Sequence, residues 1–592
     1  MADLKDGHII DYISGTRVKA TPEEVEAVQV FSKILVEDYN YPKTYVQTRP
    51  QFHVKVRPSD TKKEYPVDIS VFSKEEKNDD TIYIIVECKK KNRKDGRTQL
   101  ENYLTLSKAN IGVWFNGEQR LNLFKSNEPD GRVIFSEIPD IPKFGERLED
   151  IGKFKRKDLR PTHNLKATFK AIRNYLAANA VGATRDEVLA QQLINTIFCK
   201  IYDERFTAPE DVVQFHIGLH EDHVVVKNRI VGLFNAVKDK YREVFQKEDV
   251  INLDEGSIAY IVGALQNYCL IDAERDVLAD AFETFIGHAL KGDSGQFFTP
   301  RNVVKMMVDI INPKEGEMLI DPACGSGGFI IEALRHLWNN LNERAELYHW
   351  SQYNLLEEKI NVANTCIRGI DKDYFLAKIA KAYMAIMGDG KGGVFCEDSL
   401  ERPENWSSKT RQKVALGEFD VVLTNPPFGA KMPVTGQDKL SQYELAHKWK
   451  MSKNSQRWER MKLKEKEAPQ ILFIERCFQL LKKGGRLAIV LPDGVFGNAQ
   501  YGYIRQFIME RFRLIAVIDI PLETFQPNTG TKTSILVAQK LDHDDIPDDY
   551  QVFMCLAETC GHDRRGNIKD EDDIALVANE FKKWADDNNL NF

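Results

Sequence analysis

The sequence EMLIDPACGSGG, residues 317–328, decides the fold of the largest part of this chain. An apolar strand runs into a loop with three glycines, and the helical segment FIIEALRHLWNNL follows directly. Glycines let the backbone turn sharply and let a ligand approach closely. The first amides of a helix attract an anion. This strand, loop and helix together predict a ligand-binding loop at the edge of a sheet.

Strands and helices continue to alternate after this loop. Strand segments recur in CIRGID, FDVVLT and RLAIVLP, and the helical segments FLAKIAKAYMAIMG and ILFIERCFQLL lie between them. Such alternation predicts a mostly parallel sheet covered by helices, with ligands at the carboxyl ends of the strands. We therefore predict an α/β, Rossmann-like domain over residues 293–545 and a strand-and-helix tail over 546–592.

Acidic residues follow the predicted strands at this edge. We expect Asp321 to meet a ligand's ammonium, Asp371 to accept from two ribose hydroxyls, and Asp398 to accept from an adenine amino group. S-adenosylmethionine carries all three groups in one molecule, so the pattern predicts it as the cofactor. The loop itself is expected to contact this cofactor through Ala323, Gly325, Ser326 and Gly327.

A second motif, NPPF, follows the strand FDVVLT. The exocyclic nitrogen of adenine is a poor nucleophile because its lone pair is delocalised into the ring. The Asn425 side-chain oxygen and the Pro426 carbonyl can accept its N–H groups and aim the lone pair at the methyl group. Pro426 and Pro427 rigidify the loop, and Phe428 offers a face for stacking. Positioning should carry most of the rate, so we assign no general base, and the adenine must be flipped out of its duplex.

Two other interpretations stay open for this motif. A planar NH₂ group also occurs in a glutamine side chain, so NPPF equally fits a protein methyltransferase acting on glutamine amides. A non-enzymatic DNA-binding scaffold with a degenerate pocket is the third reading, although every expected cofactor and catalytic position holds a suitable residue. Labelled methyl transfer to DNA or to protein separates the first two, and binding of S-adenosylmethionine tests the third.

The motifs GQFFTP (295–300), DPACGSGGF, NPPF and FQPNTGTKTSILV together resemble the methylase subunit of type I restriction-modification systems. The resemblance runs from about residue 164 to the C-terminus. It implies an adenine-N6 DNA methyltransferase in which Thr299 and Pro300 help to hold the methionine end of the cofactor. AETCGHDRRGN (557–567) matches a late strand and loop of that family.

The resemblance also implies partners. In that family a separate specificity subunit selects the DNA sequence, in a complex with two methylase copies. Only about fifty residues follow the methyltransferase core, which we take as too few for a recognition domain. The amphipathic segment DDIALVANEFKKWADD near the C-terminus is a candidate element for docking to such a subunit.

The composition of the chain bears on three further features: how it could contact DNA, whether it holds a structural metal, and whether it enters a membrane. The formal net charge is −7, so any DNA contact requires local basic patches or a partner. The nine cysteines form no CxxC pair, and Cys555, Cys560 and His562 lack the fourth ligand of a structural zinc site. No apolar run is long enough to span a bilayer, and the first residues do not resemble a signal peptide. We therefore expect a cytoplasmic protein without a membrane partner.

The first part of the chain predicts a different fold. Residues 1–145 show an α/β pattern, 146–163 look like a polar linker, and 164–292 have the apolar spacing of a helical domain. The segments TPEE, YPVDIS, VECKKK, QLENY and WFNGEQR resemble the nuclease-like N-terminal domain of type I restriction subunits, which is a restriction-endonuclease-like α/β fold.

A candidate metal site accompanies this second resemblance. Asp68 and Glu87 can share a divalent cation such as Mg²⁺, and Lys89 can position or activate a water. Gln99 and Tyr103 match a Q-x-x-x-Y pattern of some nucleases. The basic residues expected to suit phosphate are Lys89, Lys90, Lys91, Arg93, Lys94 and Arg97. The chain is therefore a bifunctional methylase and nuclease, or the domain only binds DNA or docks a restriction subunit.

Overall fold

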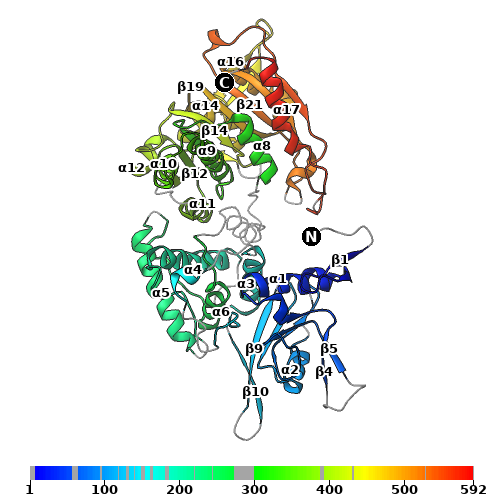
Figure 1. Ribbon diagram of the computed structural model, residues 1–592. Helices are drawn as coiled ribbons and strands as arrows, with labels where there is room; N and C mark the ends of the chain where they lie inside the picture. Colours follow the sequence, from blue (N-terminus) through cyan, green and yellow to red (C-terminus); the bar gives the residue numbers. More distant parts are fainter. Residues whose placement is uncertain are drawn as a thin grey trace. The chain divides into compact units, whose positions relative to one another are not determined.

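The computed structural model of the chain divides into two compact units (Figure 1), residues 1–240 with 247–289, and residues 241–246 with 290–592. The described residues are 7–590 without 56–63, 92, 94–95, 118, 128–131, 139, 148–153, 160–164, 181–185, 219–220, 243, 272–298, 387–392, 430–432, 527–528 and 568. Residues 272–292 of the predicted helical domain, residues 295–298 of GQFFTP, residues 527–528 of FQPNTG, and Lys94 therefore lie outside them.

The first unit begins with a mixed six-stranded sheet in the order β10-β9-β8-β7-β6-β3. Its strands are β3 (Val46–Gln47), β6 (Ile69–Phe72), β7 (Ile82–Cys88), β8 (Ile111–Phe115), β9 (Arg120–Asn127) and β10 (Val133–Glu137). Only β7 and β8 pair in parallel, and the other neighbours are antiparallel. Two ribbons accompany the sheet, β1 (His8–Ile10) with β2 (Arg17–Lys19), and β4 (Phe52–Lys55) with β5 (Glu64–Val67).

Helices cover both faces of this sheet. The short π-helix η1 (Glu24–Val28) leads into α1 (Gln29–Glu37). Phe31 and Leu35 of α1 pack on one face of the sheet. Helix α2 (Arg97–Leu106) packs on the other face. The central strands read as continuous apolar runs because both of their faces are buried. The predicted α/β pattern of this domain is confirmed. The turn η2 (Lys43–Tyr45) precedes β3.

A helical part completes the first unit. It contains η4 (Arg156–Asp158), α3 (Leu165–Asn179), α4 (Asp186–Phe206), α5 (His223–Lys240) and α6 (Glu255–Leu265). Phe154 and Leu159, from the segment expected to be a polar linker, are buried against Val213 and Cys269. The buried Asp140 accepts hydrogen bonds from Arg120 of the sheet and Asn267 of the helical part. The α/β and helical parts are thus packed together as one unit.

The second unit is built on an eight-stranded sheet in the order β13-β12-β11-β14-β19-β21-β20-β22. The strands are β11 (Leu319–Asp321), β12 (Ile367–Asp371), β13 (Val394–Cys396), β14 (Phe419–Thr424), β19 (Leu481–Pro492), β20 (Phe512–Asp519), β21 (Thr533–Lys540) and β22 (Phe553–Leu556). The first five strands are parallel, and β21 is antiparallel to β19 and β20. This is the predicted Rossmann-like fold.

The chain order of this sheet reverses between β11 and β14. From β11 the chain builds outward through β12 and β13, and it then returns to the other side of β11 to form β14. In parallel sheets such a switch point, at the carboxyl ends of the strands, is where ligands bind. The predicted loop 321–328 and the NPPF motif leave the two strands at this point.

Helices and small ribbons surround the sheet. The helices are α8 (Arg301–Ile311), α9 (Gly328–Leu347), α10 (Gln352–Thr365), α11 (Tyr374–Ile386), α12 (Ser408–Arg411), α13 (Gln437–Leu440), α14 (Pro469–Leu480), α15 (Gly494–Gly497), α16 (Gly502–Arg511) and α17 (Ile574–Asp587), with short turns η5 (Pro403–Asn405), η6 (Ala499–Tyr501), η7 (Leu522–Phe525) and η8 (His543–Asp545). The ribbons are β15 (Val434–Thr435) with β18 (Lys466–Glu467), and β16 (His447–Met451) with β17 (Trp458–Leu463). One large apolar core lies between the sheet and helices α14 and α16.

The amphipathic C-terminal helix α17 uses its apolar face inside this unit. Ile574, Val577 and Phe581 are buried, and the Phe581 ring lies 5.5 Å from that of Phe553 in β22. The helix also packs against α8, beside which it lies in Figure 1. Its amphipathic pattern is therefore explained by packing within the chain and gives no support to subunit docking. Within the described parts of the chain, we find no helix that combines the length and the apolar character needed to cross a lipid bilayer.

Candidate active site

The loop after β11 takes a conformation that two of its glycines permit. Gly325 and Gly327 have φ angles of +52° and +97°, in the left-handed region that side chains disfavour. Gly327 precedes helix α9, and no side chain caps that N-terminus. The first amides of α9 therefore point out of the helix at the switch point, as an anion site requires. Ser326 lies within the turn and is buried.

Asp321, the last residue of β11, forms a hydrogen bond with this loop. One of its carboxylate oxygens accepts a hydrogen bond of 3.0 Å from the amide of Ala323. The other oxygen is buried. Burial raises the pKa of Asp321 to about 7, although the Thr424 hydroxyl nearby lowers it in part, and the charge of Asp371 adds to the rise. The predicted ammonium contact would thus require a ligand to reach an acid that is 1% exposed.

Asp371 joins the glycine loop to the end of β12. Its two carboxylate oxygens accept from the amides of Gly325 and Asp373, each at 2.9 Å. An ionised carboxylate has about four acceptor positions, so both oxygens retain capacity for ligand hydroxyls. Burial raises the pKa of Asp371. Its place beside the loop agrees with the predicted contact to a ribose.

Asp398 lies in the turn after β13. It is held by a lysine side chain, Lys439, that the sequence did not identify as part of the site. One carboxylate oxygen accepts from the amide of Leu400 at 2.9 Å, and the other accepts from the ammonium of Lys439 at 2.8 Å. Lys439 also pairs with Glu401 at 3.0 Å. Burial alone would lower the pKa of Lys439, but its hydrogen bonds to these two acids outweigh burial and raise it. The predicted adenine acceptor is therefore already fixed in position.

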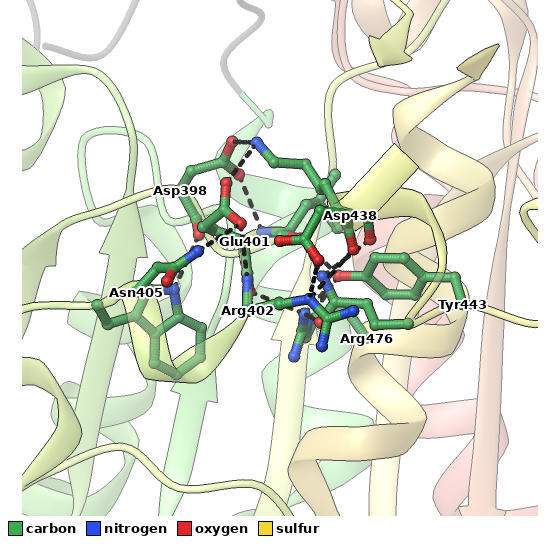
Figure 2. A network of polar contacts seen from close by, with 11 residues as sticks. Asp398, Glu401, Arg402, Asn405, Asp438, Tyr443 and Arg476 are labelled. Atoms are coloured by element: carbon green, nitrogen blue, oxygen red, sulfur yellow. Dashed lines mark hydrogen bonds and ion pairs between the residues drawn. The ribbon is translucent and has the colours of Figure 1, made fainter. Parts of the chain in front are cut away.

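A network of polar contacts, with Arg476 and Tyr443 buried at its centre, supports the turn that carries Asp398 (Figure 2). Arg476 of α14 is fully buried, and its guanidinium donates to the Tyr443 hydroxyl and, at 3.0 Å, to the Glu401 carbonyl. The Tyr443 hydroxyl in turn donates to the Leu400 carbonyl at 2.9 Å. Arg402 and Asp438 form a further ion pair of 3.1 Å. These contacts tie three separate stretches of chain together, so they pre-organise the acid.

The NPPF motif follows β14 directly, as predicted. The Asn425 amide nitrogen donates to the Thr299 hydroxyl at 2.9 Å. Its carbonyl oxygen is buried and accepts no hydrogen bond from any described residue. The Phe428 ring meets Phe525 edge-on, with centroids 6.3 Å apart. Thr299 therefore orients Asn425 here, whereas the sequence had suggested that it holds a ligand. Pro300 precedes the first residue of α8.

A cavity of about 380 Å³ joins these strand ends. The predicted residues in its lining are Ala323, Gly325, Asp371, Asp398, Asn425, Pro426, Pro427 and Phe428. Thr299, Pro300, Asp321, Ser326 and Gly327 are not part of the lining. Asp321 and Ser326 adjoin lining residues in the chain, and Thr299 accepts a hydrogen bond from the lining residue Asn425. The volume falls within the usual range for small-molecule sites.

The lining also contains residues that sequence reasoning missed. These are Pro322, Lys372, Leu376, Ser399, Leu400, Gly429, Pro433, Val434, Thr435, Lys439, Pro469 and Phe473. Five of them, namely Pro322, Lys372, Ser399, Leu400 and Gly429, lie within two residues of a predicted site residue and could have been found by extending its motif. Pro469 and Phe473 follow NPPF by 41 and 45 residues, and only tertiary packing brings them back.

A second candidate site lies in the first unit. Asp68, between β5 and β6, accepts from the amide of Cys88 at 2.8 Å, which places it beside Glu87. Lys89 forms an ion pair with Glu87, so the side chains of these two residues point to the same side of the strand. Burial raises the pKa of Asp68 to about 6 and that of Glu87 to about 7, and the charge of Asp68 adds to the shift at Glu87. A bound cation would offset this cost of burying two carboxylates.

Other predicted residues of this site are only partly in place. Gln99 donates to the Tyr103 hydroxyl at 2.6 Å, and besides burial the charges of Glu87 and Asp68 raise the pKa of Tyr103. Arg97 is paired with Glu101 and Glu137. Among the residues described, no three His, Cys, Asp or Glu side chains are arranged to hold a metal ion. The site thus offers a cation at most two carboxylates.

Two family models match this chain. Residues 273–592, more than half of its length, match the family described as N-6 DNA Methylase. The chain belongs to the N-6 DNA methylase family. Residues 22–142 match the model described as the type I restriction enzyme R protein N terminus.

Curated relatives of this N-6 DNA methylase include subunits of type I restriction enzymes. The EcoEI methylase subunit of Escherichia coli is 26% identical over 370 residues, which are 62% of this chain and 62% of the relative. The StySPI methylase subunit of Salmonella potsdam is 24% identical over 322 residues, 53% of this chain and 54% of the relative. The chain thus spans between half and two thirds of the length of these relatives.

Solved structures with similar chains include a type I restriction-modification methyltransferase subunit from Streptococcus thermophilus. It is 17% identical, has a TM-score of 0.47, and is matched over 72% of this chain and 94% of that one. The family models and the curated relatives confirm both resemblances predicted from the sequence, to type I methylase subunits and to the N-terminal domain of the restriction subunits.

Proposed function

We propose that this chain transfers a methyl group from S-adenosylmethionine to N6 of an adenine flipped out of DNA, as the methylase subunit of a type I-like restriction-modification system. A separate specificity subunit would select the target sequence, in an assembly with a second methylase copy and, where one exists, a restriction subunit. The observation that carries the proposal is the unpartnered, buried oxygen of Asn425 beside the cavity that Asp371 and Asp398 line.

The residues present fit the cofactor. Asp371 retains acceptor positions for ribose hydroxyls, and Asp398 lines the same cavity, where Lys439 holds it for an adenine amino group. The loop that includes Ala323, Gly325, Ser326 and Gly327 brings the N-terminus of α9 to the carboxylate end. When bound, S-adenosylmethionine supplies an electrophilic methyl group on a sulfonium that leaves as a neutral thioether.

The chain's own groups prepare the nucleophile. The Asn425 oxygen and the Pro426 carbonyl would accept the two N–H groups of the target amine, which pyramidalises its nitrogen and frees the lone pair to form the new N–C bond. The amine then loses one proton to solvent. Thr299 keeps the Asn425 amide from rotating, because it accepts from the nitrogen on the opposite side. Phe428 would stack on the flipped base.

The test is a product analysis. The chain is purified with its specificity subunit and incubated with labelled S-adenosylmethionine and unmethylated DNA, and the DNA is then digested to nucleosides. We expect the label in N6-methyladenine. Label in protein rather than in DNA would instead favour glutamine-amide methylation, and label in cytosine would contradict the proposed target atom.

We also propose a metal-dependent nuclease site at Asp68, Glu87 and Lys89. The raised pKa values of the two acids and the adjacent lysine favour it. Mg²⁺ would be held by both carboxylates and would keep several waters, and Lys89 would position one of them. DNA nicking in Mg²⁺ should be lost in Asp68→Ala/Lys89→Ala and kept in the exposed-site control Lys582→Ala/Lys583→Ala. Nicking that persists in the first variant would contradict this assignment.

A further inference from the structure

The segment 447–466 concentrates positive charge in a chain that is negative overall. It contains eight Lys or Arg residues and two Glu residues, while the whole chain carries a net charge of −7. Seven of the cations are exposed. Arg457 pairs with Glu510, and the other six are Lys448, Lys450, Lys453, Arg460, Lys462 and Lys466. Within the described part of the chain, none of these six forms an ion pair with an acidic residue. Their charge is therefore free to attract an anionic partner.

The segment is a firmly anchored hairpin rather than a loose loop. Strands β16 and β17 pair in antiparallel fashion, and the Trp449 ring stacks on Tyr503 of α16 at 5.7 Å. The amide of Trp458 donates to the Gln506 side chain at 2.7 Å, and that side chain donates back to the Trp458 carbonyl at 3.1 Å. Lys448 and Lys450, on either side of Trp449 in the sequence, are exposed, whereas Trp449 is partly buried. The tryptophans thus fix the hairpin on the unit and its lysines face solvent.

The hairpin segment ends beside the cavity. Val434 and Thr435 of β15 line the cavity, and Thr435 pairs with Lys466 at the end of the hairpin segment. Directly afterwards, Pro469 and Phe473 of α14 line the cavity again. A base that enters the cavity must remain attached to its strand, so the flanking phosphates pass the cavity's rim.

We propose that the β16–β17 hairpin binds the phosphate backbone of the DNA next to the flipped adenine. This inference rests on the proposed function and adds a contact surface to it. Duplex DNA carries one negative charge per about 1.7 Å of its axis, so a fixed row of unpaired cations matches it. Backbone contacts of this kind set position and carry no sequence information, which agrees with sequence selection by a separate subunit.

The test compares two charge-neutralising variants of the full chain. Lys448→Gln/Lys450→Gln alters the hairpin, and Lys582→Gln/Lys583→Gln removes two exposed charges from α17 as a control. Binding of a fluorescent DNA duplex of random sequence is followed by anisotropy at several salt concentrations. We expect several-fold weaker binding for the hairpin variant alone. The slope of log affinity against log salt should fall by roughly 0.9 for each lost phosphate contact.

The outcomes separate this inference from the proposed function. If the hairpin variant binds DNA with the wild-type affinity and salt slope, the hairpin is not a DNA contact, although methyl transfer stands. If it binds DNA normally but fails to assemble with the specificity subunit in size-exclusion chromatography, the basic surface docks a protein and the inference is wrong. If the wild-type chain neither binds DNA nor methylates it with its specificity subunit, both proposals fail.

Discussion

The Asn425 side chain combines a satisfied donor with an unsatisfied acceptor. Its nitrogen is held by Thr299, and its buried oxygen has no partner among the described residues. Leaving a buried acceptor unpaired costs about 1–3 kcal/mol, and a ligand in the cavity that Asn425 lines would offset this cost. A donor on a planar NH₂ group supplies that partner.

The buried acid Asp321 should make stability depend on pH. Its pKa is raised from an ordinary value near 3.8 to about 7. The protonated form is therefore favoured in the folded state, and its stabilising effect is lost as pH rises from about 4 to about 7. Asp321→Asn keeps an acceptor for Ala323 and cannot ionise. Relative to this variant, the wild-type protein without cofactor should lose on the order of 2 kcal/mol between pH 5 and pH 8.

Melting temperatures of both proteins at pH 5 and pH 8 measure this difference. Other groups titrate in both proteins equally, so only the change in the gap between the two matters. A gap that is the same at both pH values would show that Asp321 does not titrate in this range.

Phe428 should contribute through its ring alone. Base–aromatic stacking is worth about 1–3 kcal/mol, so Phe428→Ala should lower methyl transfer at limiting DNA by roughly ten-fold to a hundred-fold. Phe428→Tyr keeps the ring and should retain most activity. Fluorescence of 2-aminopurine at the target position reports base flipping in both variants. Equal flipping and transfer by Ala and Tyr variants would rule out stacking at this position.

The sequence could predict the site residues that follow strand ends. Asp371, Asp398 and Asn425 stand at or within two residues of the ends of apolar strands, and the parallel order of the sheet brings all three to one cavity. Lys439 could not be predicted, because its contact with Asp398 depends on how a long excursion folds back. The burial of Asp321 could not be predicted either. A motif gives the order of residues but does not show how far a side chain lies from the ligand.

Helices and strands were easier to predict than the elements that pack against them. The apolar spacing of α17 correctly gave a helix with one apolar face, but it could not show that β22 and α8 of the same unit cover that face. The apolar residues within the expected linker, Phe154 and Leu159, were likewise obscured by the charges around them. A local pattern indicates that a face is buried and leaves its partner undetermined.

Helix α17 should stabilise its unit through Phe581. This ring is 4% exposed and lies 5.7 Å from Trp584 as well as 5.5 Å from Phe553. Phe581→Ala should reduce the free energy of unfolding by about 3–5 kcal/mol, seen as a clear fall in melting temperature. Leu576→Ala, on the same helix but 59% exposed, is the matched control and should change little. Similar losses in both variants would mean that the helix does not pack as described.

The whole molecule combines two compact units with different chemistry. The first unit places two acids and a lysine beside a sheet, and the second places a cavity at the switch point of a larger sheet. All the residues assigned to methyl transfer belong to the second unit. The central claim about the molecule is therefore that this cavity transfers methyl groups and that Asn425 holds the accepting nitrogen.

The most direct measurement compares the wild type with Asn425→Ala, each purified with its specificity subunit, for calorimetric binding of S-adenosylmethionine and for labelled methyl transfer to unmethylated DNA. Because the proposal assigns the amine to Asn425 and the cofactor to other residues, we predict similar cofactor affinity and at least a roughly hundred-fold loss of transfer in the variant. Transfer by Asn425→Ala at the wild-type rate would contradict the account.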